Sequence, residues 1–394
     1  MLKLIKNAVV FAPEALGQKN LLIGGGRILW IGDAAPALPA SIPCNSVDLD
    51  GRRLVPGLID GHAHVTGGGG ESGFASRVPA VGLSRFTRCG ITTVVGLLGT
   101  DDTTRDTKSL LAETRSLREQ GINAFCHTGG YHVPPATLTG SVRGDIVHID
   151  PIIGVGEVAV SDHRSSQPTL NELMRIASDA HVAGMITGKA GIMHIHLGDG
   201  ERGLSLIREA LEVSELPARV FNPTHINRRR ALFDEACELA RDGCYVDLTA
   251  FPVAEGEDAW TATDGLLRYL DSGAPAARVT ISSDGGGCLP HFDADGRIVH
   301  MDIGEPSSLA ETLAELLRRG SALETVLPAF TENPARLLRL HGKGTIATGQ
   351  DADLVELADD HSVRSVMIGG EWHLQAGTQL ITGSFEAAIS GGDH

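Results

Sequence analysis

Two kinds of hydrophobic pattern divide the chain. The first 55 residues and the segment after residue 340 hold short apolar runs typical of β-strands, broken by Gly and Pro and without a helical period. Each of these parts alone has too few strands to bury a face, so the pattern predicts one small sheet built from both ends of the chain. The expected strands are 2–11, 20–31, 46–55, 353–356, 363–368 and 371–373.

Between these ends, apolar β-type runs alternate with amphipathic stretches. Eight β runs spread over about 280 residues favour a parallel sheet covered by helices, in the form of a (β/α)8 TIM barrel. The β runs are 58–65, 91–98, 122–127, 152–161, 192–197, 219–224, 244–249 and 278–283, and the helical candidates include 107–120, 170–183, 201–213, 231–242, 307–319, 322–330 and 334–340.

A doubly wound open sheet is the alternative architecture. Against it, no GxGxxG motif follows the first β run of this region, and polar residues recur at the ends of nearly every run. The predicted fold class is therefore α/β, with a barrel domain at 56–340 and a small β-sandwich domain made of 1–55 and 341–394.

Charge and composition limit the kinds of partner that the protein is expected to bind. The 33 Lys and Arg against 49 Asp and Glu give a formal charge of -16, which disfavours nucleic acid and anionic membranes. No apolar run approaches the roughly 20 residues of a membrane span, and the first residues lack a secretory signal. A cytoplasmic protein is expected. Six scattered cysteines without a CxxC pair suit reduced thiols.

Metal-type side chains stand where the predicted barrel strands end. His62 and His64 are two residues apart at the end of the first β run, so they share one face of the strand. His196, His225 and Asp284 end or follow the fifth, sixth and eighth runs. Since TIM barrels build their active sites at the carboxyl ends of their strands, and imidazole and carboxylate bind Zn²⁺, this pattern predicts a metal site.

Six short motifs follow one another along the chain: HVTGGGGE at 64–71, GLLGTD at 96–101, YHVP at 131–134, SDHR at 161–164, THINR at 224–228 and SDG at 283–285. Their order and spacing resemble the amidohydrolase superfamily of metal-dependent hydrolases and, within it, the isoaspartyl dipeptidase family. The similarity extends from the N-terminal sheet to KGTIATGQDADL at 343–354, so it covers nearly the whole chain. The resemblance implies a binuclear site for Zn²⁺, with Co²⁺ or Mn²⁺ possible, and a homo-oligomer that could be an octamer.

One departure from the family concerns the bridge between the metals. Binuclear members use a carbamylated lysine from strand 4, but this chain has no lysine between Lys108 and Lys189. Glu157 occupies the corresponding place. Its side chain is shorter, so the backbone must approach the metals, and Gly154 and Gly156 would allow this through a bulge. We therefore expect Glu157 to be the bridge. Lys189 is the rival, but it precedes strand 5 and lies at the wrong end of the barrel.

The resemblance also assigns roles in catalysis. Asp284 would take the proton of a metal-bridging hydroxide and pass it to the departing amine, and the Tyr131 hydroxyl would help the metal to stabilise the oxyanion. Apart from the resemblance, His194 and His127 are each expected to be hydrogen-bonded structural residues. A serine hydrolase is disfavoured because no GxSxG motif is present. The implied ligands are His62, His64 and Asp284 for one metal and His196 and His225 for the other, with Glu157 shared.

The remaining charges suggest the substrate. A β-aspartyl dipeptide carries one ammonium and two carboxylates beside its scissile isopeptide amide. Glu71 would fit the ammonium, and Arg164 and Arg228 could clamp the carboxylates with forked hydrogen bonds. The alternative for these three residues is a set of solvated loop charges. The resemblance adds four pocket residues, Gly69, Gly70, Thr100 and Cys288, the last in place of a family serine.

The sequence therefore predicts a metallodipeptidase that hydrolyses β-aspartyl dipeptides. A cyclic-amide hydrolase of the dihydropyrimidinase or hydantoinase kind, or a deaminase, is the alternative on the same scaffold, but it leaves Glu71, Arg164 and Arg228 without a task. A non-catalytic assembly protein that has lost its metals is a third possibility, and the complete set of six ligands argues against it.

Overall fold

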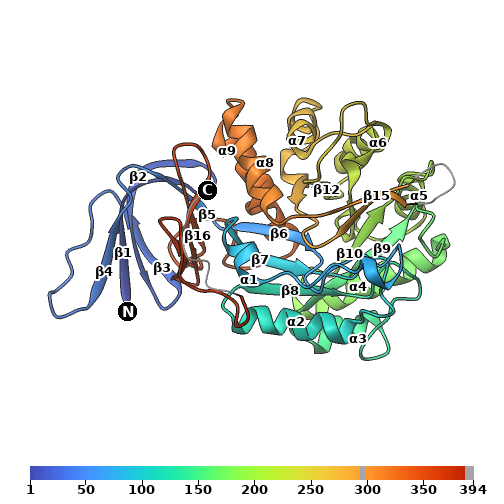
Figure 1. Ribbon diagram of the computed structural model, residues 1–394, viewed down its shortest axis with the longest axis horizontal. Helices are drawn as coiled ribbons and strands as arrows, with labels where there is room; N and C mark the ends of the chain where they lie inside the picture. The colour runs from blue at the N-terminus through green and yellow to red at the C-terminus, as the bar shows by residue number, and fades with distance from the viewer. Residues whose placement is uncertain (293–297, 387–394) are drawn as a thin grey trace.

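The computed structural model describes residues 1–292 and 298–386. Its elements form two parts, a twisted sheet at one end of the molecule and a barrel of strands and helices at the other (Figure 1). The predicted α/β class, a TIM barrel with a small β domain built from both termini, is confirmed. Among the described residues, no helix is both long and apolar enough to cross a membrane.

Both ends of the chain build the nine-stranded sheet. Its strands follow the order β19-β18-β17-β16-β5-β1-β2-β3, with β4 paired to β1. The antiparallel pairing of β16 with β5 joins the C-terminal strands to the N-terminal ones. The strands are β1 (Leu2–Phe11), β2 (Ala15–Gly24), β3 (Arg27–Gly32), β4 (Cys44–Asp48), β5 (Arg53–Pro56), β16 (Leu354–Leu357), β17 (Val363–Ile368), β18 (Glu371–Gln375) and β19 (Thr378–Gln379).

One apolar core holds the two arms of this sheet together. Val10 of β1 and Leu21 of β2 pack in the same buried cluster as Leu354 of β16 and Met367 of β17. Neither arm could bury this face alone, which is why the small domain needs both ends of the chain. The segments 20–31 and 46–55, each expected as one strand, are instead divided between β2 and β3 and between β4 and β5. Gly25 and Gly26, with φ of 59° and 78°, form the tight turn between β2 and β3.

The barrel strands begin at β6 and belong to two sheets. Six parallel strands follow in the order β11-β10-β9-β8-β7-β6, and β12 pairs with β13. A parallel bridge between Ala63 and Gly285 links the end of β6 to the segment after β13. The strands are β6 (Leu58–Ala63), β7 (Ile91–Gly96), β8 (Asn123–Thr128), β9 (Ile152–Val160), β10 (Ile192–Leu197), β11 (Phe221–Thr224), β12 (Val246–Thr249) and β13 (Val279–Ser282).

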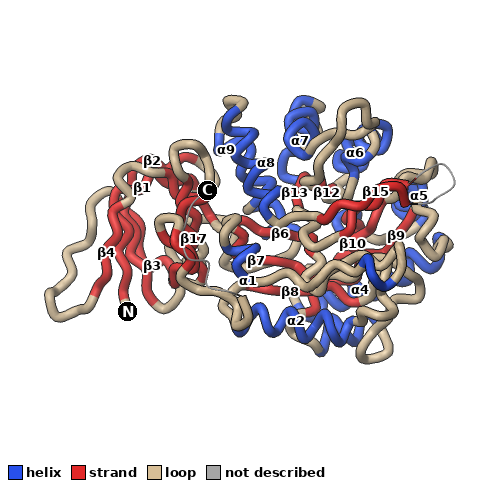
Figure 2. Tube along the Cα trace, in the orientation of Figure 1, coloured by secondary structure: helices blue, strands red, loops and turns tan. Residues whose placement is uncertain are grey.

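Helices cover the outside of the barrel strands (Figure 2). α1, α3, α7 and a β14-β15 hairpin were not among the elements expected from the sequence. The helices are α1 (Leu83–Thr87), α2 (Thr107–Glu119), α3 (Val142–His148), α4 (Leu170–Thr187), α5 (Ser205–Val213), α6 (Arg230–Arg241), α7 (Ala262–Asp271), α8 (Ser307–Arg318), α9 (Leu323–Val326) and α10 (Glu332–Leu337), and the hairpin strands are β14 (Cys288–Phe292) and β15 (Ile298–Ile303).

The longest helix, α4, shows how local sequence sets these elements. The Thr169 side chain accepts from the Glu172 backbone, and the Glu172 carboxylate accepts in return from the Thr169 backbone, so a capping box begins the helix. Gly188 ends it in the left-handed conformation, with φ of 74°. Barrel strands such as β9 and β10 are buried along their whole length, as expected for a parallel sheet covered by helices.

Candidate metal centre

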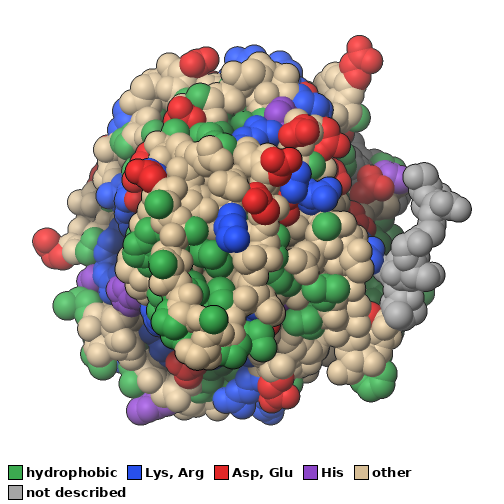
Figure 3. Space-filling view, turned by 90° about the vertical axis from the view of Figure 1, so that its left-hand side faces the viewer, with side chains coloured by type: hydrophobic (Ala, Val, Ile, Leu, Met, Phe, Trp, Pro, Cys, Tyr) green, Lys and Arg blue, Asp and Glu red, His purple; other side chains and the backbone are tan. Residues whose placement is uncertain are grey.

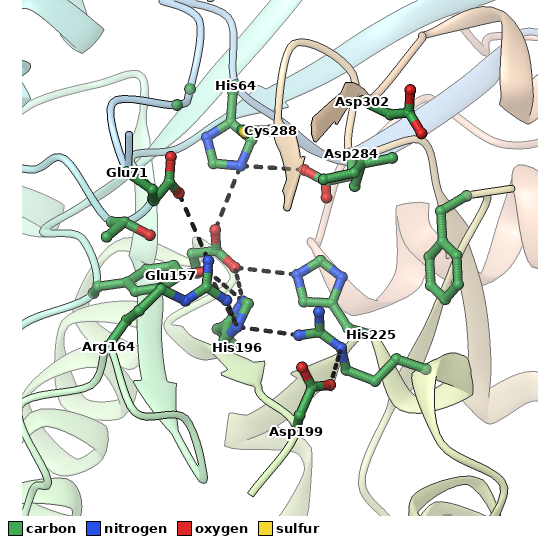
Figure 4. A pocket seen from close by; sticks show the side chains of 18 of the residues that line it. His64, Glu71, Glu157, Arg164, His196, Asp199, His225, Asp284, Cys288 and Asp302 are labelled. Carbon is green, nitrogen blue, oxygen red and sulfur yellow. Dashed lines mark hydrogen bonds and ion pairs between the residues drawn. The ribbon is translucent and has the colours of Figure 1, made fainter. Parts of the chain in front are cut away.

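Four histidines surround the carboxylate of Glu157 at the mouth of the barrel, and three of them, His64, His196 and His225, are seen in Figure 4. Glu157 Oε1 lies 3.7 Å from His62 Nε2 and 3.4 Å from His64 Nε2. Its Oε2 atom lies 3.1 Å from His196 Nδ1 and 3.4 Å from His225 Nε2. Each carboxylate oxygen therefore faces a different pair of imidazoles, an arrangement in which one residue can contact two cations.

Asp284 completes the first of these pairs. Its Oδ1 atom lies 3.4 Å from His62 Nε2 and 3.2 Å from His64 Nε2. Within the described part of the chain, neither Asp284 Oδ1 nor His62 Nε2 has a hydrogen-bond partner, although both atoms are buried. Buried polar atoms without partners are costly, and a divalent cation held by nitrogen and oxygen would satisfy them. The residues present therefore fit a metal ion.

A bulge in β9 brings Glu157 to this place. In the pairing with β10, Met193 lies opposite Val155 but Ile195 lies opposite Val158, so β9 carries one extra residue. A side chain on Gly156 would come within 2.6 Å of the His194 carbonyl oxygen. The bulge that the sequence predicted around Gly156 is thus present, and only glycine allows its close approach to β10.

A chain of hydrogen bonds behind the centre sets the tautomer of His62. His194 Nδ1 lies 2.7 Å from Asn222 Oδ1, and Asn222 Nδ2 donates to the Tyr245 carbonyl, so His194 Nδ1 carries the proton. His194 Nε2 then accepts from His62 Nδ1 at 2.9 Å, so when His62 loses its second proton to bind a cation, its lone pair is on Nε2, facing the site. His194 is hydrogen-bonded, as predicted, but neither ring nitrogen of the buried His127 has a hydrogen-bond partner among the described residues, so the prediction is wrong for His127.

Burial and the charges of neighbouring side chains shift the pKa values of the candidate ligands. Burial lowers the pKa of His62, but the Glu157 and Asp284 carboxylates outweigh it and raise the pKa to about 9. Burial raises the pKa of Glu157 and of Asp284, but the neighbouring histidines hold both pKa values well below their usual range. Burial lowers the pKa of His225 to about 3, which keeps this imidazole neutral. The two carboxylates are therefore ionised, as metal ligands must be.

The centre opens into a cavity of about 390 Å³. Most of the residues predicted to bind the substrate line this cavity, together with Tyr131 and the candidate ligands His64, Glu157, His196, His225 and Asp284. Gly70 is the exception, since it is not among the lining residues and a Cβ there would come within 3.8 Å of Arg77 and Asp101. The predicted pocket residues that line the cavity are Gly69, Glu71, Thr100, Arg164, Arg228 and Cys288.

Polar atoms in this cavity remain available to a ligand. Glu71 Oε1 lies 3.6 Å from Arg164 Nη1. Glu71 Oε2 and Thr100 Oγ1 are buried, and neither has a hydrogen-bond partner within the described residues. The Tyr131 hydroxyl lies 2.7 Å from His196 Nδ1. Burial and nearby carboxylates raise the pKa of Cys288 to about 12, so this residue is a neutral thiol.

Two aspartates of the site were not found from the sequence. Asp162 accepts hydrogen bonds from Arg164 and lies against His196. Asp199, which also lines the cavity, pairs with Arg228 Nε at 3.2 Å. Asp162 is the second residue of the SDHR motif at 161–164. The motif alone did not show which side chains Asp162 would contact.

Lys189, the rival candidate for the bridge, is held elsewhere. Its Nζ donates to the backbone carbonyls of Ile146, Ile149 and Ile152 at 2.6, 2.7 and 3.0 Å. Ile152 is the first residue of β9, at the end of the strand opposite the bulge. Lys189 therefore ties α3 and the start of β9 together rather than approaching the histidines.

Replacing Lys189 with methionine tests this difference. We expect Lys189→Met to lower the free energy of unfolding by about 2 kcal/mol, because three carbonyls lose a charged donor, and to leave the metal content unchanged. Chemical denaturation and elemental analysis of the purified variant measure the two quantities. Loss of metal from a folded Lys189→Met protein would return this lysine to the centre.

A parallel barrel with histidines and carboxylates gathered at the carboxyl ends of its strands defines a class of protein, the TIM-barrel metal-dependent hydrolases. The chain belongs to the amidohydrolase family, whose family model matches residues 53–373.

Sequence relatives and solved structures are similar to this chain over most of its length. The β-aspartyl dipeptidase of Fervidobacterium islandicum AW-1, solved in complex with a β-Asp-Leu dipeptide, is 44% identical to this chain, with a TM-score of 0.90 over 96% of this chain and 98% of that one. A deacetylase of Agrobacterium fabrum is 25% identical, over 85% of this chain and 77% of its own length. A D-hydantoinase structure is 17% identical with a TM-score of 0.67 over 98% of both chains, and shares the fold. The predicted resemblance is confirmed.

Proposed function

We propose that this protein hydrolyses the isopeptide bond of β-aspartyl dipeptides. The proposal depends on one combination of features. Glu157 lies between two pairs of histidines, and the cavity that it lines also holds the charged groups of Glu71, Arg164 and Arg228. The 44% identity to a β-aspartyl dipeptidase supports it.

The charges of the cavity match those of such a dipeptide. The free Oε2 atom of Glu71 is suited to accept from the substrate ammonium. The guanidinium groups of Arg164 and Arg228 can each donate two parallel hydrogen bonds to a carboxylate. Thr100 and Cys288 offer short polar contacts beside them. A cyclic amide carries neither the ammonium nor both carboxylates, so it would leave these residues unused.

Asp284 and Tyr131 have the positions needed for the reaction. Bound divalent cations would supply an activated water and polarise the scissile carbonyl. The Asp284 carboxylate, ionised and at the mouth of the barrel, can accept the proton of the attacking water and return it to the departing amine. The Tyr131 hydroxyl faces the centre beside His196. It can donate a hydrogen bond to the negative charge that develops on the oxygen of the scissile carbonyl.

We propose two metal ions for each chain. One would be held by His62, His64 and Asp284 and the other by His196 and His225, with Glu157 shared. The mixed nitrogen and oxygen donors suit Zn²⁺ best, and Co²⁺ and Mn²⁺ accept overlapping ligands.

Hydrolysis of matched dipeptides tests the function. Purified, metal-loaded protein should release aspartate from β-Asp-Leu and should leave α-Asp-Leu intact, since the α-linked isomer places its ammonium and carboxylate differently around the amide. Dialysis against a chelator should abolish the activity, and added Zn²⁺ should restore it. Absence of hydrolysis by protein with full metal content, or hydrolysis of hydantoins instead, would contradict the proposal.

The arginine clamp gives a separate prediction. Arg228→Lys should raise the KM for β-Asp-Leu by about 10-fold or more, because a lysine cannot make the forked contact with a carboxylate. The kcat should change less. Arg230→Lys is the control, since Arg230 stacks over Trp260 and is not among the lining residues of the cavity. Steady-state kinetics of both variants decide, and equal KM values in wild type and Arg228→Lys would remove Arg228 from substrate binding.

Three further proposals concern the whole molecule. We propose a cytoplasmic homo-oligomer, with the octamer as the form that the family resemblance implies, and we propose a barrel domain at 56–340 and a small domain made of 1–55 and 341–394. Hydrophobic side chains gather on the face formed by the sheet end of the molecule (Figure 3), where an apolar groove is lined by Met1, Leu29, Ile42 and Pro43, among others. Burial of such a groove between subunits would be favourable, and analytical ultracentrifugation measures the oligomeric state.

A further inference from the structure

Asp162 lies at a junction between the metal centre and the substrate cavity. It follows β9 by two residues, and its side chain is only 3% exposed. Its Oδ1 atom accepts from the Arg164 backbone at 2.7 Å and from Arg164 Nε at 3.0 Å. Its Oδ2 atom accepts from Arg164 Nη2 at 2.7 Å and lies 3.0 Å from His196 Nε2. One buried carboxylate therefore contacts both an imidazole of the centre and an arginine of the cavity.

The contact with His196 fixes how this imidazole can bind. Asp162 Oδ2 requires a proton on Nε2, because an ionised carboxylate only accepts hydrogen bonds. The lone pair of a neutral His196 is then on Nδ1, the atom that lies 3.1 Å from Glu157 Oε2. A carboxylate behind a ligating histidine orients the ring and strengthens the ligand, and its loss typically costs about 10- to 100-fold in metal affinity.

The contact with Arg164 fixes the direction of its guanidinium. Two of its nitrogens, Nε and Nη2, form a fork on Asp162, which is the most directional pairing that arginine makes. The third nitrogen, Nη1, is left toward Glu71, 3.6 Å from its Oε1 atom (Figure 4). One edge of the Arg164 guanidinium therefore faces the cavity, while the other edge is hydrogen-bonded to Asp162.

The backbone is shaped to admit this carboxylate. A Cβ on Gly198, directly after β10, would come within 2.3 Å of Asp162 Cβ, so the loop after β10 must carry glycine for Asp162 to occupy its position. Ser161, the residue before Asp162, has φ of 52°, a left-handed conformation that non-glycine residues rarely adopt. Its hydroxyl donates to the Gly200 carbonyl and secures the turn.

We propose that Asp162 is a positioning residue that sets the His196 ring for metal binding and the Arg164 guanidinium for substrate binding at the same time. This inference rests on the proposed function for its substrate half, whereas its metal half depends only on the centre. Removal of the carboxylate weakens both kinds of binding together, which distinguishes Asp162 from a residue that serves only the fold.

Asp162→Asn is the direct test, because the amide keeps the shape but turns an NH2 group toward a donor on His196 or Arg164. Zinc affinity, measured by competition with a chromogenic chelator, should fall by about 10- to 100-fold. At saturating zinc, the KM for β-Asp-Leu should rise by about 10-fold, with a smaller change in kcat. A general loss of folding would instead lower the active fraction and leave the KM unchanged.

Two further variants make the test decisive. Asp145→Asn removes a fully buried carboxylate that accepts from Thr128 and Thr139 and is not among the lining residues of the cavity, so it should change neither zinc affinity nor KM. Gly198→Ala displaces Asp162 without altering a polar group and should shift both quantities in the same direction as Asp162→Asn, by less.

Unchanged zinc affinity and KM in folded Asp162→Asn would overturn the inference, as would equal shifts in Asp145→Asn. If the wild-type protein holds zinc but does not cleave β-Asp-Leu, the proposed function fails, and the chelator competition still decides whether Asp162 positions His196.

Discussion

Glu157→Gln is expected to lose one metal equivalent per chain and to reduce hydrolysis of β-Asp-Leu on the order of 10³-fold. A glutamine presents one oxygen and one NH2 group, and the NH2 group cannot bind a cation. One of the two histidine pairs that now face Oε1 and Oε2 would therefore lose its anionic ligand. Elemental analysis and steady-state kinetics on the same preparation measure both effects.

Lys189→Met serves as the matched control for Glu157→Gln. Both changes remove a charge from neighbouring elements of the barrel, but Lys189 binds backbone carbonyls at the start of β9. Full metal content and full activity in Glu157→Gln would move the bridge to another residue.

The second large effect is expected at Asp284. Asp284→Asn should lower kcat by about 10²- to 10⁴-fold, the usual contribution of a general acid or base, and should leave the KM for β-Asp-Leu within a few-fold of wild type. The amide cannot take the proton of the attacking water. Its oxygen can still face His62 and His64, so the first metal position is weakened less than by alanine.

Asp302 provides the comparison for Asp284. It also lines the cavity, but its side chain is 47% exposed and pairs with His300. Asp302→Asn should retain kcat. A kcat for Asp284→Asn within about 10-fold of wild type at full metal occupancy would show that another group moves the proton, since a general acid or base contributes more than this.

Much of the fold followed from periodicity. The barrel strands are continuous apolar runs because they are buried on both faces, and this made all eight recognisable. The prediction of a single strand at 20–31 was wrong because the apolar pattern continues across the turn at Gly25 and Gly26. Periodicity alone does not reveal a hairpin turn. α3 has only seven residues, too few for a helical period to stand out.

The ligand candidates could be predicted because each lies at a strand end, and the carboxyl ends of parallel strands meet at one rim. Glu157 also followed from the sequence, through the glycines that permit the bulge. The pairing of Asp162 with His196 and of Asp199 with Arg228 could not be predicted, because it depends on which loop side chains turn inward after the strands. Gly70 was assigned to the cavity with Gly69, yet only Gly69 lines it.

The central claim is that this rim holds two cations on either side of one glutamate. Anomalous diffraction from crystals grown with Zn²⁺, recorded at the zinc absorption edge, tests it most directly. We predict two peaks per chain, one between His62, His64 and Asp284 and one between His196 and His225, with Glu157 between the peaks. A single peak, or two peaks that do not share Glu157, would contradict the account.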